Sequence, residues 1–218
     1  MFIGHFAPAL IAATHKDAPS LPVLFVAAQL VDWAFFGFVL AGIEQFRLVP
    51  GFSEVSSMDL FHMPYTHSLV GSAAFAAGFG ALLFAFTRNR MTALIGAAVV
   101  LSHWFLDLLV HMPDLTIAGG EQKFGLGLWD YAIIEMPLEL GITLAALHIY
   151  AYKTGGWRMP VTILGITLLA LQAIDWLGEK PVEVGPSMIF LGWFAFGVAT
   201  LAAWWAGRGQ KPGAIKTA

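Results

Sequence analysis

Cysteine is absent from the 218-residue chain, and charged residues make up only 11% of it, against about 25% in an average soluble domain. The missing cysteines exclude a disulfide scaffold, thiolate catalysis and thiolate metal sites. The low charge excludes a soluble globular domain, which needs enough polar surface to cover its core. The net charge of −3 and the hydrophobic content of 58% exclude a nucleic-acid-binding protein and a disordered chain.

Long apolar runs dominate the sequence, and its mean hydropathy is +0.75. A run of about 20 apolar residues can cross a bilayer as a helix. The runs are continuous rather than alternating, which favours helices over membrane strands. We therefore predict an all-α polytopic bundle of about six transmembrane helices in a single domain, residues 1–218, with spans at 21–43, 67–86, 91–111, 126–152, 160–176 and 186–206.

Basic residues are distributed unevenly over the predicted loops. Every second loop, counting both ends, holds most of them: Lys16, Arg88, Arg90, Lys153, Arg158, Arg208, Lys211 and Lys216. The other loops hold Arg47, Lys123 and Lys180. Because cytoplasmic loops carry the excess of lysine and arginine, this pattern predicts a multi-pass protein of the bacterial inner membrane with both termini in the cytoplasm.

The first 14 residues are apolar but too short to span a bilayer. A secretory signal has a basic region before its apolar core, whereas the first lysine here, Lys16, follows it. We expect instead a short half-inserted helix packed against the bundle, which would place His5 in the interior.

Several ionisable residues fall inside the predicted spans, where an unpartnered charge costs about 2.5–3.5 kcal/mol on insertion scales. His103, Asp107 and His111 are spaced four apart and therefore share one helix face. Glu135 and Glu139 repeat this spacing on the next span. Imidazoles and carboxylates without thiolates suit a divalent metal, zinc first and manganese as an alternative.

Each polar residue also has a structural interpretation. A buried His–Asp pair can simply tie two helices together, and Glu139 can serve helix packing. Glu135 is predicted to lie nearer the cluster and is the better functional candidate.

The motifs occur in a recognisable order: His5, then LVD ending at Asp32, then HMPYTHS from His62 to Ser68, then SHWFLD from Ser102 to Asp107. This order resembles the bacterial membrane-bound metal-dependent hydrolase family, which is distantly similar to zinc-dependent phospholipase C. The resemblance covers about the first 115 residues. It implies a multi-helix membrane hydrolase whose metal ligands are His5, Asp32, His67, His103 and Asp107, with His62 as a further imidazole or a group supporting the ligands.

One departure from the family pattern concerns a possible anion-binding group. Met63 and Pro64 stand where the common form has Arg-Gly. The chain therefore lacks an arginine that could clamp a phosphate at this position.

The leading hypothesis is a membrane-embedded hydrolase of an ester or phosphoester in a lipid or lipid-linked substrate, with Glu135 or His111 as the general base. The second is a non-catalytic subunit that binds other membrane proteins in a larger complex. The third is an ion or proton-coupled transporter, although no repeat between the two halves supports it.

Overall fold

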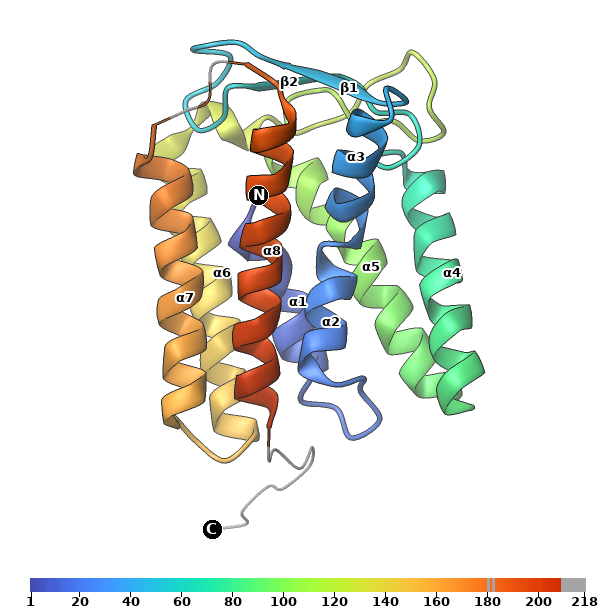
Figure 1. Ribbon diagram of the computed structural model, residues 1–218, viewed down its shortest axis with the longest axis vertical. Helices are drawn as coiled ribbons and strands as arrows, with labels where there is room; N and C mark the ends of the chain where they lie inside the picture. Colours follow the sequence, from blue (N-terminus) through green and yellow to red (C-terminus); the bar gives the residue numbers. More distant parts are fainter. Residues whose placement is uncertain (180, 182, 209–218) are drawn as a thin grey trace.

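The computed structural model describes residues 1–179, 181 and 183–208. Lys180, Lys211 and Lys216, which the charge analysis assigns to loops, lie outside the described residues. The prediction of an all-α polytopic bundle is confirmed, with one small hairpin added (Figure 1). The elements in chain order are η1 (Ile3–His5), α1 (Phe6–Ala12), α2 (Leu21–Ala28), α3 (Leu30–Leu40), β1 (Gln45–Leu48), β2 (Met58–His62), α4 (Leu69–Thr87), α5 (Arg90–Val110), η2 (Leu128–Asp130), α6 (Ala132–Lys153), α7 (Met159–Leu177) and α8 (Pro186–Gly207).

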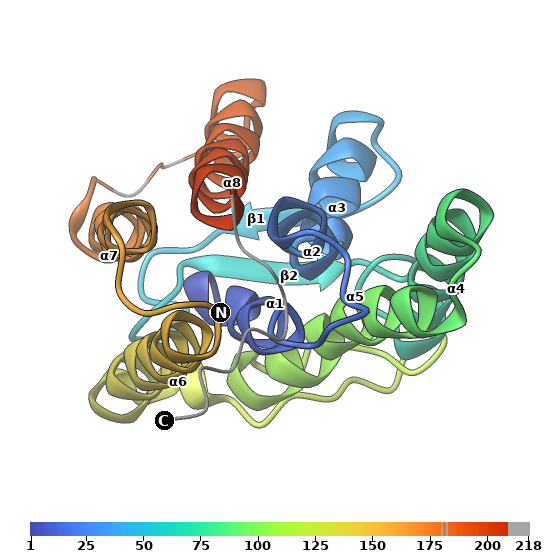
Figure 2. The same ribbon diagram turned by 90° about the horizontal axis from the view of Figure 1, so that it is seen from below.

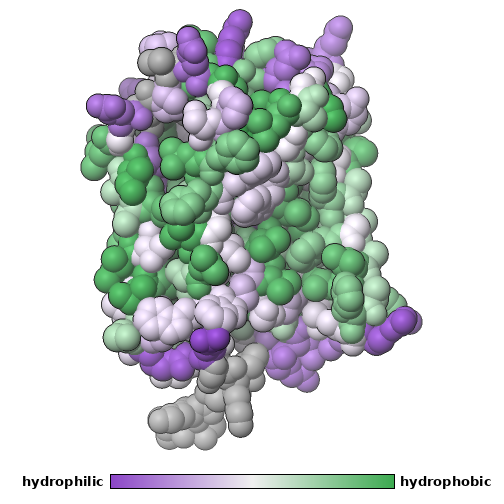
Figure 3. Space-filling view, in the orientation of Figure 1, coloured by the Kyte–Doolittle hydropathy of each residue, from purple (hydrophilic) through white to green (hydrophobic). Residues whose placement is uncertain are grey.

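Five of these helices, α4 to α8, are 19 to 22 residues long and apolar enough to cross a membrane. At about 1.5 Å per residue each measures roughly 30 Å, the thickness of the hydrocarbon core. The pair α2 and α3 passes the same test as one bent span, which makes up to six crossings. Side chains of high hydropathy form a broad band around the visible face, with hydrophilic residues gathered at its two ends (Figure 3).

The predicted start of the fourth span at Leu126 is wrong, because α6 begins at Ala132. The six preceding residues form a turn and η2 instead. Gly127 has a φ of +71°, in the left-handed region that favours glycine. The Leu126 and Gly127 amides donate to the carbonyl oxygens of Leu108 and His111. This segment is therefore held against the end of α5.

The first span bends by 50° at Gln29, between α2 and α3. The Gln29 side chain is fully buried, and its amide Nε2 donates to the Phe2 carbonyl oxygen at 3.2 Å. The bend places Asp32 in the first turn of α3. It also leaves the Ala28 carbonyl oxygen accessible to a side chain of α5.

The N-terminal segment forms the predicted short helix, packed against the bundle. Seen from below, η1 and α1 run inside the ring formed by the other helices (Figure 2), and Ile3, Phe6 and Leu10 are fully buried. The backbone N–H groups that begin this segment have no partner within it. Polar side chains of two spans accept from them.

Two side chains satisfy these amides in the interior. Glu139 Oε1 on α6 accepts from the Phe2 amide and, at 2.9 Å, from the Gly4 amide. Gln172 Oε1 on α7 accepts from the Ile3 amide at 3.2 Å. Glu139 is therefore a structural residue that holds the inserted segment, as its packing interpretation suggested.

The end of the bundle above α3 is covered by the β1–β2 hairpin and the long α5–α6 connection (Figure 1). These strands are not predicted from the sequence. They pair antiparallel, and Arg47 Nε on β1 contacts Asp59 Oδ2 on β2 at 2.6 Å. Phe46, Leu60 and Met63 are buried against Phe35 and other residues of the helices. The cover closes the interior from this side.

The connections that carry most of the basic residues lie together at the opposite end of the bundle. The α1–α2, α4–α5 and α6–α7 connections and the end of α8 are all found there (Figure 1). This arrangement agrees with an even number of crossings and with the segregation of charge on which the orientation rests.

Replacing Glu139 by leucine tests how the N-terminal segment is held. The change leaves two buried N–H groups without an acceptor, and each such group costs about 1–3 kcal/mol. We expect a clear fall in the thermal unfolding midpoint of the detergent-solubilised protein. Glu139→Gln keeps one acceptor oxygen and should lose less stability. Equal midpoints for Glu139→Leu and the unmodified protein would refute the role.

Candidate metal centre

Buried imidazoles and carboxylates meet between η1, α3, α4 and α5, close to the covered end of the bundle. The His67 side chain enters immediately before α4, and His111 caps the C-terminus of α5. The side chains of this cluster are buried, apart from that of Asp32, which is 22% exposed. The members of the cluster are His5, Asp32, His67, His103, Asp107 and His111.

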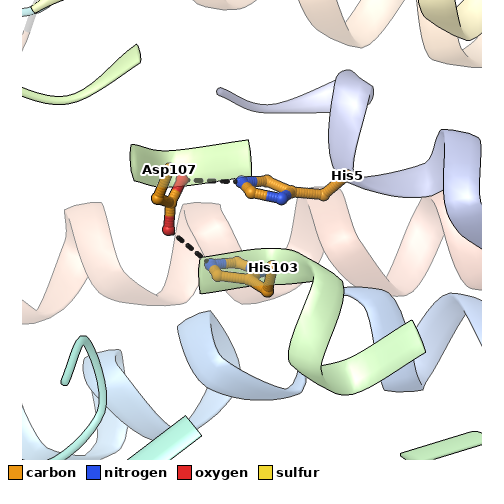
Figure 4. A group of neighbouring side chains, drawn as sticks. All are labelled: His5, His103 and Asp107. Carbon is orange, nitrogen blue, oxygen red and sulfur yellow. Dashed lines mark ion pairs between the residues drawn. The ribbon is translucent and has the colours of Figure 1, made fainter. Parts of the chain in front are cut away.

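Asp107 occupies the centre of the cluster, and its two carboxylate oxygens face different histidines. Oδ1 lies 3.0 Å from His5 Nε2 and 3.2 Å from His111 Nε2. Oδ2 lies 3.0 Å from His103 Nε2 and 3.7 Å from His67 Nε2. The spacing of four residues along α5 therefore brings His103 and His111 to opposite oxygens of one carboxylate (Figure 4 shows the His5 and His103 contacts).

Asp32 supplies a second carboxylate on the Oδ2 side of Asp107. Its Oδ1 lies 3.4 Å from His67 Nε2 and 3.5 Å from His103 Nε2. Because Asp32 keeps partial exposure while its neighbours are buried, we expect access to the cluster from the side of α3.

His103 is oriented by the broken first span. Its Nδ1 lies 2.9 Å from the Ala28 carbonyl oxygen. A carbonyl oxygen only accepts, so Nδ1 carries the proton of this hydrogen bond. In the neutral ring Nε2 then bears a lone pair, and it faces the carboxylates of Asp32 and Asp107.

His111 is oriented in the same way by Asp114, whose Oδ1 lies 2.9 Å from Nδ1. The ring also stacks on Trp129 at 4.2 Å between centroids. Burial alone would lower the pKa of His111, but the negative charges of Asp107 and Asp114 outweigh it and raise the pKa to about 9. The surroundings of this ring therefore favour positive charge, supplied by a proton or by a metal ion that displaces it.

His67 is oriented by a relay through a hydroxyl. Thr66 Oγ1 donates to Glu44 Oε2 at 2.6 Å and lies 2.9 Å from His67 Nδ1. A hydroxyl has one proton, and the carboxylate takes it, so Thr66 accepts from the His67 Nδ1–H. Glu44 is itself fixed by the backbone amides of Tyr65 and Thr66, which donate to its Oε1.

These constraints direct lone pairs inward and protons outward, a pattern typical of histidine metal ligands whose second nitrogen is held by an outer partner. His103 Nε2 and Asp107 Oδ2 lie 3.0 Å apart, yet neither has a hydrogen-bond partner among the described residues. Two such buried acceptors repel each other unless a proton or a metal ion lies between them. The residues therefore fit a divalent metal, and the ligand atoms in each of two sets lie within 4.8 Å of one another: His5, His103 and Asp107, and Asp32, His67 and His103.

His62 is the one predicted ligand that the structure does not bring to the cluster. It ends strand β2 opposite Gln45, and its side chain is exposed. The next residue, Met63, points inward and is buried in the apolar layer beneath the hairpin.

The predicted base Glu135 lies one turn before Glu139 on α6 and is fully buried. The charged groups that act on it most are Glu139 and the Met1 amino group, rather than the histidines. Its carboxylate therefore interacts with Glu139 rather than with the histidine cluster.

Sequence reasoning missed the residues that orient the imidazoles. Asp114 follows His111 by three positions in HMPD, and this spacing is the only signal for it. Glu44 and Thr66 are 22 positions apart in two connections, and no pattern joins them.

Comparisons of this chain with protein-family models, with curated proteins and with solved structures found no match. The interpretation of the site therefore rests on its own geometry.

Replacing Thr66 by valine tests the orientation of His67. Valine has nearly the same shape but cannot accept the Nδ1–H, so the ring loses its fixed tautomer. Loss of such an outer partner typically weakens metal affinity about 10–100-fold. We expect this loss in a zinc competition titration with a chromogenic chelator. Thr66→Ser retains the hydroxyl and should stay close to the unmodified protein, and equal affinity in Thr66→Val would contradict the relay.

Proposed function

We propose that this chain is a divalent-metal-dependent hydrolase of the bacterial inner membrane, acting on an ester or phosphoester of a lipid or lipid-linked substrate. Zinc is the expected metal, with manganese as the alternative. Cytoplasmic basic connections and a cytoplasmic end of α8 would turn the covered end of the bundle, and with it the cluster, toward the periplasm. The predicted cytoplasmic position of the N-terminus is wrong, because the Met1 amino group is buried inside the bundle, 3.8 Å from Asp107 Oδ1.

One observation carries the proposal: buried lone pairs converge on a single place. Among the described residues, His103 Nε2 and Asp107 Oδ2 face each other at 3.0 Å without a hydrogen bond. The Ala28 carbonyl oxygen and the Asp114 carboxylate bind Nδ1 of His103 and of His111, so that Nε2 of each ring faces Asp107. A purely structural His–Asp pair would instead share a proton in a well-aligned hydrogen bond. When bound, a divalent metal supplies Lewis-acid polarisation of the scissile ester.

The motif order supports the same function. His5, Asp32, His67, His103 and Asp107 are the positions at which the resemblance to membrane-bound metal-dependent hydrolases implies ligands, and they are the residues that gather here. His111 joins them, held against Asp107 by Asp114. We therefore assign His111 to metal binding rather than to proton transfer.

Hydrolysis also requires a group that takes a proton from the attacking water. Glu135 remains the candidate: its buried carboxylate interacts with Glu139 and with the Met1 amino group, and that amino group lies 3.8 Å from Asp107 Oδ1.

An apolar groove supports a lipid substrate. It has a volume of about 860 Å³ and runs between α3 and α4, lined among others by Leu30, Phe75, Gly78 and Leu82. The groove lies along a membrane-spanning helix, where hydrocarbon is the surrounding medium. Its lining includes Ser68, the residue directly after His67. We propose that an acyl chain of the lipid lies in this groove.

A second candidate function is a non-catalytic subunit of a membrane complex. The position that holds arginine in the common form of the family is here Met63, buried in the apolar layer under the hairpin. A metal centre that stabilises the fold without catalysis would be consistent with this loss of an anion-binding side chain.

Elemental analysis of the detergent-purified protein tests the metal. We expect stoichiometric zinc or manganese in the unmodified protein and its loss in Asp107→Asn, because the central carboxylate is removed. His62→Gln, which alters an exposed histidine outside the cluster, is the matched control and should retain metal. A folded protein that stays metal-free after reconstitution with zinc would overturn the proposal.

Filling the groove tests the lipid substrate. A Cβ at Gly78 meets no atom within 4 Å, so Gly78→Leu places its side chain in the groove without disturbing the packing. We expect at least a roughly tenfold loss of hydrolysis of a long-chain phospholipid in mixed micelles, with hydrolysis of a short water-soluble phosphoester retained.

Gly141→Leu on α6 is the control, since a Cβ there also meets no atom within 4 Å. It carries the same glycine-to-leucine change in a helix away from the groove. An equal loss in both variants would show that the groove does not hold the substrate. Metal-loaded protein without activity toward any lipid ester or phosphoester would favour the accessory subunit.

A further inference from the structure

Two imidazole rings in the cluster are stacked on each other. The ring centroids of His5 and His103 lie 3.8 Å apart, and their planes differ by only 6° (Figure 4). Each ring directs Nε2 at a different oxygen of Asp107, at 3.0 Å in both cases. The two rings therefore approach one carboxylate side by side.

This arrangement does not suit one shared metal ion. The lone pair of an imidazole nitrogen lies in the plane of its ring, and zinc binds it there at about 2.0–2.1 Å. Two parallel planes at stacking distance have no point in common. An ion between them would lie on the order of 2 Å out of each plane, a displacement as large as the bond itself.

The remaining donors divide into two sets about the same carboxylate. Asp107 Oδ2 faces His67 and His103, and Asp32 Oδ1 faces the same two rings, which gives a four-donor set. Asp107 Oδ1 faces His5 and His111, which gives a set of three side-chain donors, and the buried Met1 amino group lies 3.8 Å from the same oxygen. Together these side chains offer more donors than one tetrahedral zinc ion accepts.

We propose that the cluster is a two-metal centre in which Asp107 bridges the ions, one held by Asp32, His67 and His103 and the other by His5 and His111. The inference rests on the proposed function, since it assumes that the cluster binds divalent metal. Paired ions in hydrolytic sites lie about 3.5–4 Å apart, which matches the 3.8 Å between the stacked rings that would serve them.

The two sets differ in what they leave open. Four protein donors close a tetrahedral site, as in structural zinc centres, whereas three leave a position for substrate. The remaining position of the three-donor set is buried beside the Met1 amino group, which lies 3.8 Å from Asp107 Oδ1, whereas the partly exposed Asp32 places the four-donor set on the side from which we expect access. Two-metal centres of this spacing are typical of phosphatases and nucleases, although aminopeptidases share them. We infer that the substrate is a phosphoester of a lipid.

Metal stoichiometry distinguishes one ion from two. The detergent-purified protein is loaded with zinc, freed of excess metal by gel filtration and analysed for zinc per chain. We expect two ions in the unmodified protein and in His62→Gln, one in His5→Gln and one in Asp32→Asn. Asp107→Asn should hold neither tightly. His111→Gln provides a second variant of the three-donor set and should also retain one.

A measurement without mutation complements this series. Protein reconstituted with manganese should show the electron paramagnetic resonance spectrum of two exchange-coupled ions rather than that of isolated Mn²⁺. One ion per chain, with an uncoupled spectrum, would overturn the two-metal centre and leave the proposed metal-dependent hydrolase intact. No bound metal at all would overturn both.

Discussion

The carboxylate of Asp107 is buried inside a bundle that hydrocarbon surrounds, and much of the architecture near it serves to compensate that charge. An isolated carboxylate in such a medium is strongly disfavoured, so it persists only with partners. Histidines from η1, from α5 and its C-cap, and from the position before the N-cap of α4 supply them, and the hairpin and the α5–α6 connection close the end above. The helix packing and the cluster of histidines therefore both compensate the buried charge of Asp107.

Only part of this arrangement could be predicted from the sequence. The number of spans follows from the length of the apolar runs, and the approach of His103 and His111 to Asp107 follows from their helical spacing. The short N-terminal helix follows from an apolar run too short to cross. These features are local, and local periodicity encodes them.

Other features depend on contacts that no period encodes. No proline or glycine lies next to Gln29, so the sequence does not predict the bend there. His62 lies in the same short motif as His67, yet it ends a strand whose pairing leaves it exposed while Met63 turns inward. The relay from Glu44 through Thr66 joins two separate connections. The predicted start of the fourth span at Leu126 failed because apolar residues also fill a turn that packs on the end of α5.

The polar residues inside the spans fall into two groups with different tasks, and the first group makes the second possible. Gln29, Glu139 and Gln172 come from three different spans and bind the backbone of residues 2–4. None of them contacts a histidine of the cluster through a hydrogen bond among the described residues. Their effect is to fix the chain directly before His5, whose ring then stacks on His103 and reaches Asp107. A free N-terminal segment would lose conformational entropy on bringing this ring into place. The inserted segment is ordered by hydrogen bonds to Glu139, Gln172 and Gln29, so His5 is positioned in the cluster although it lies close to the end of the chain.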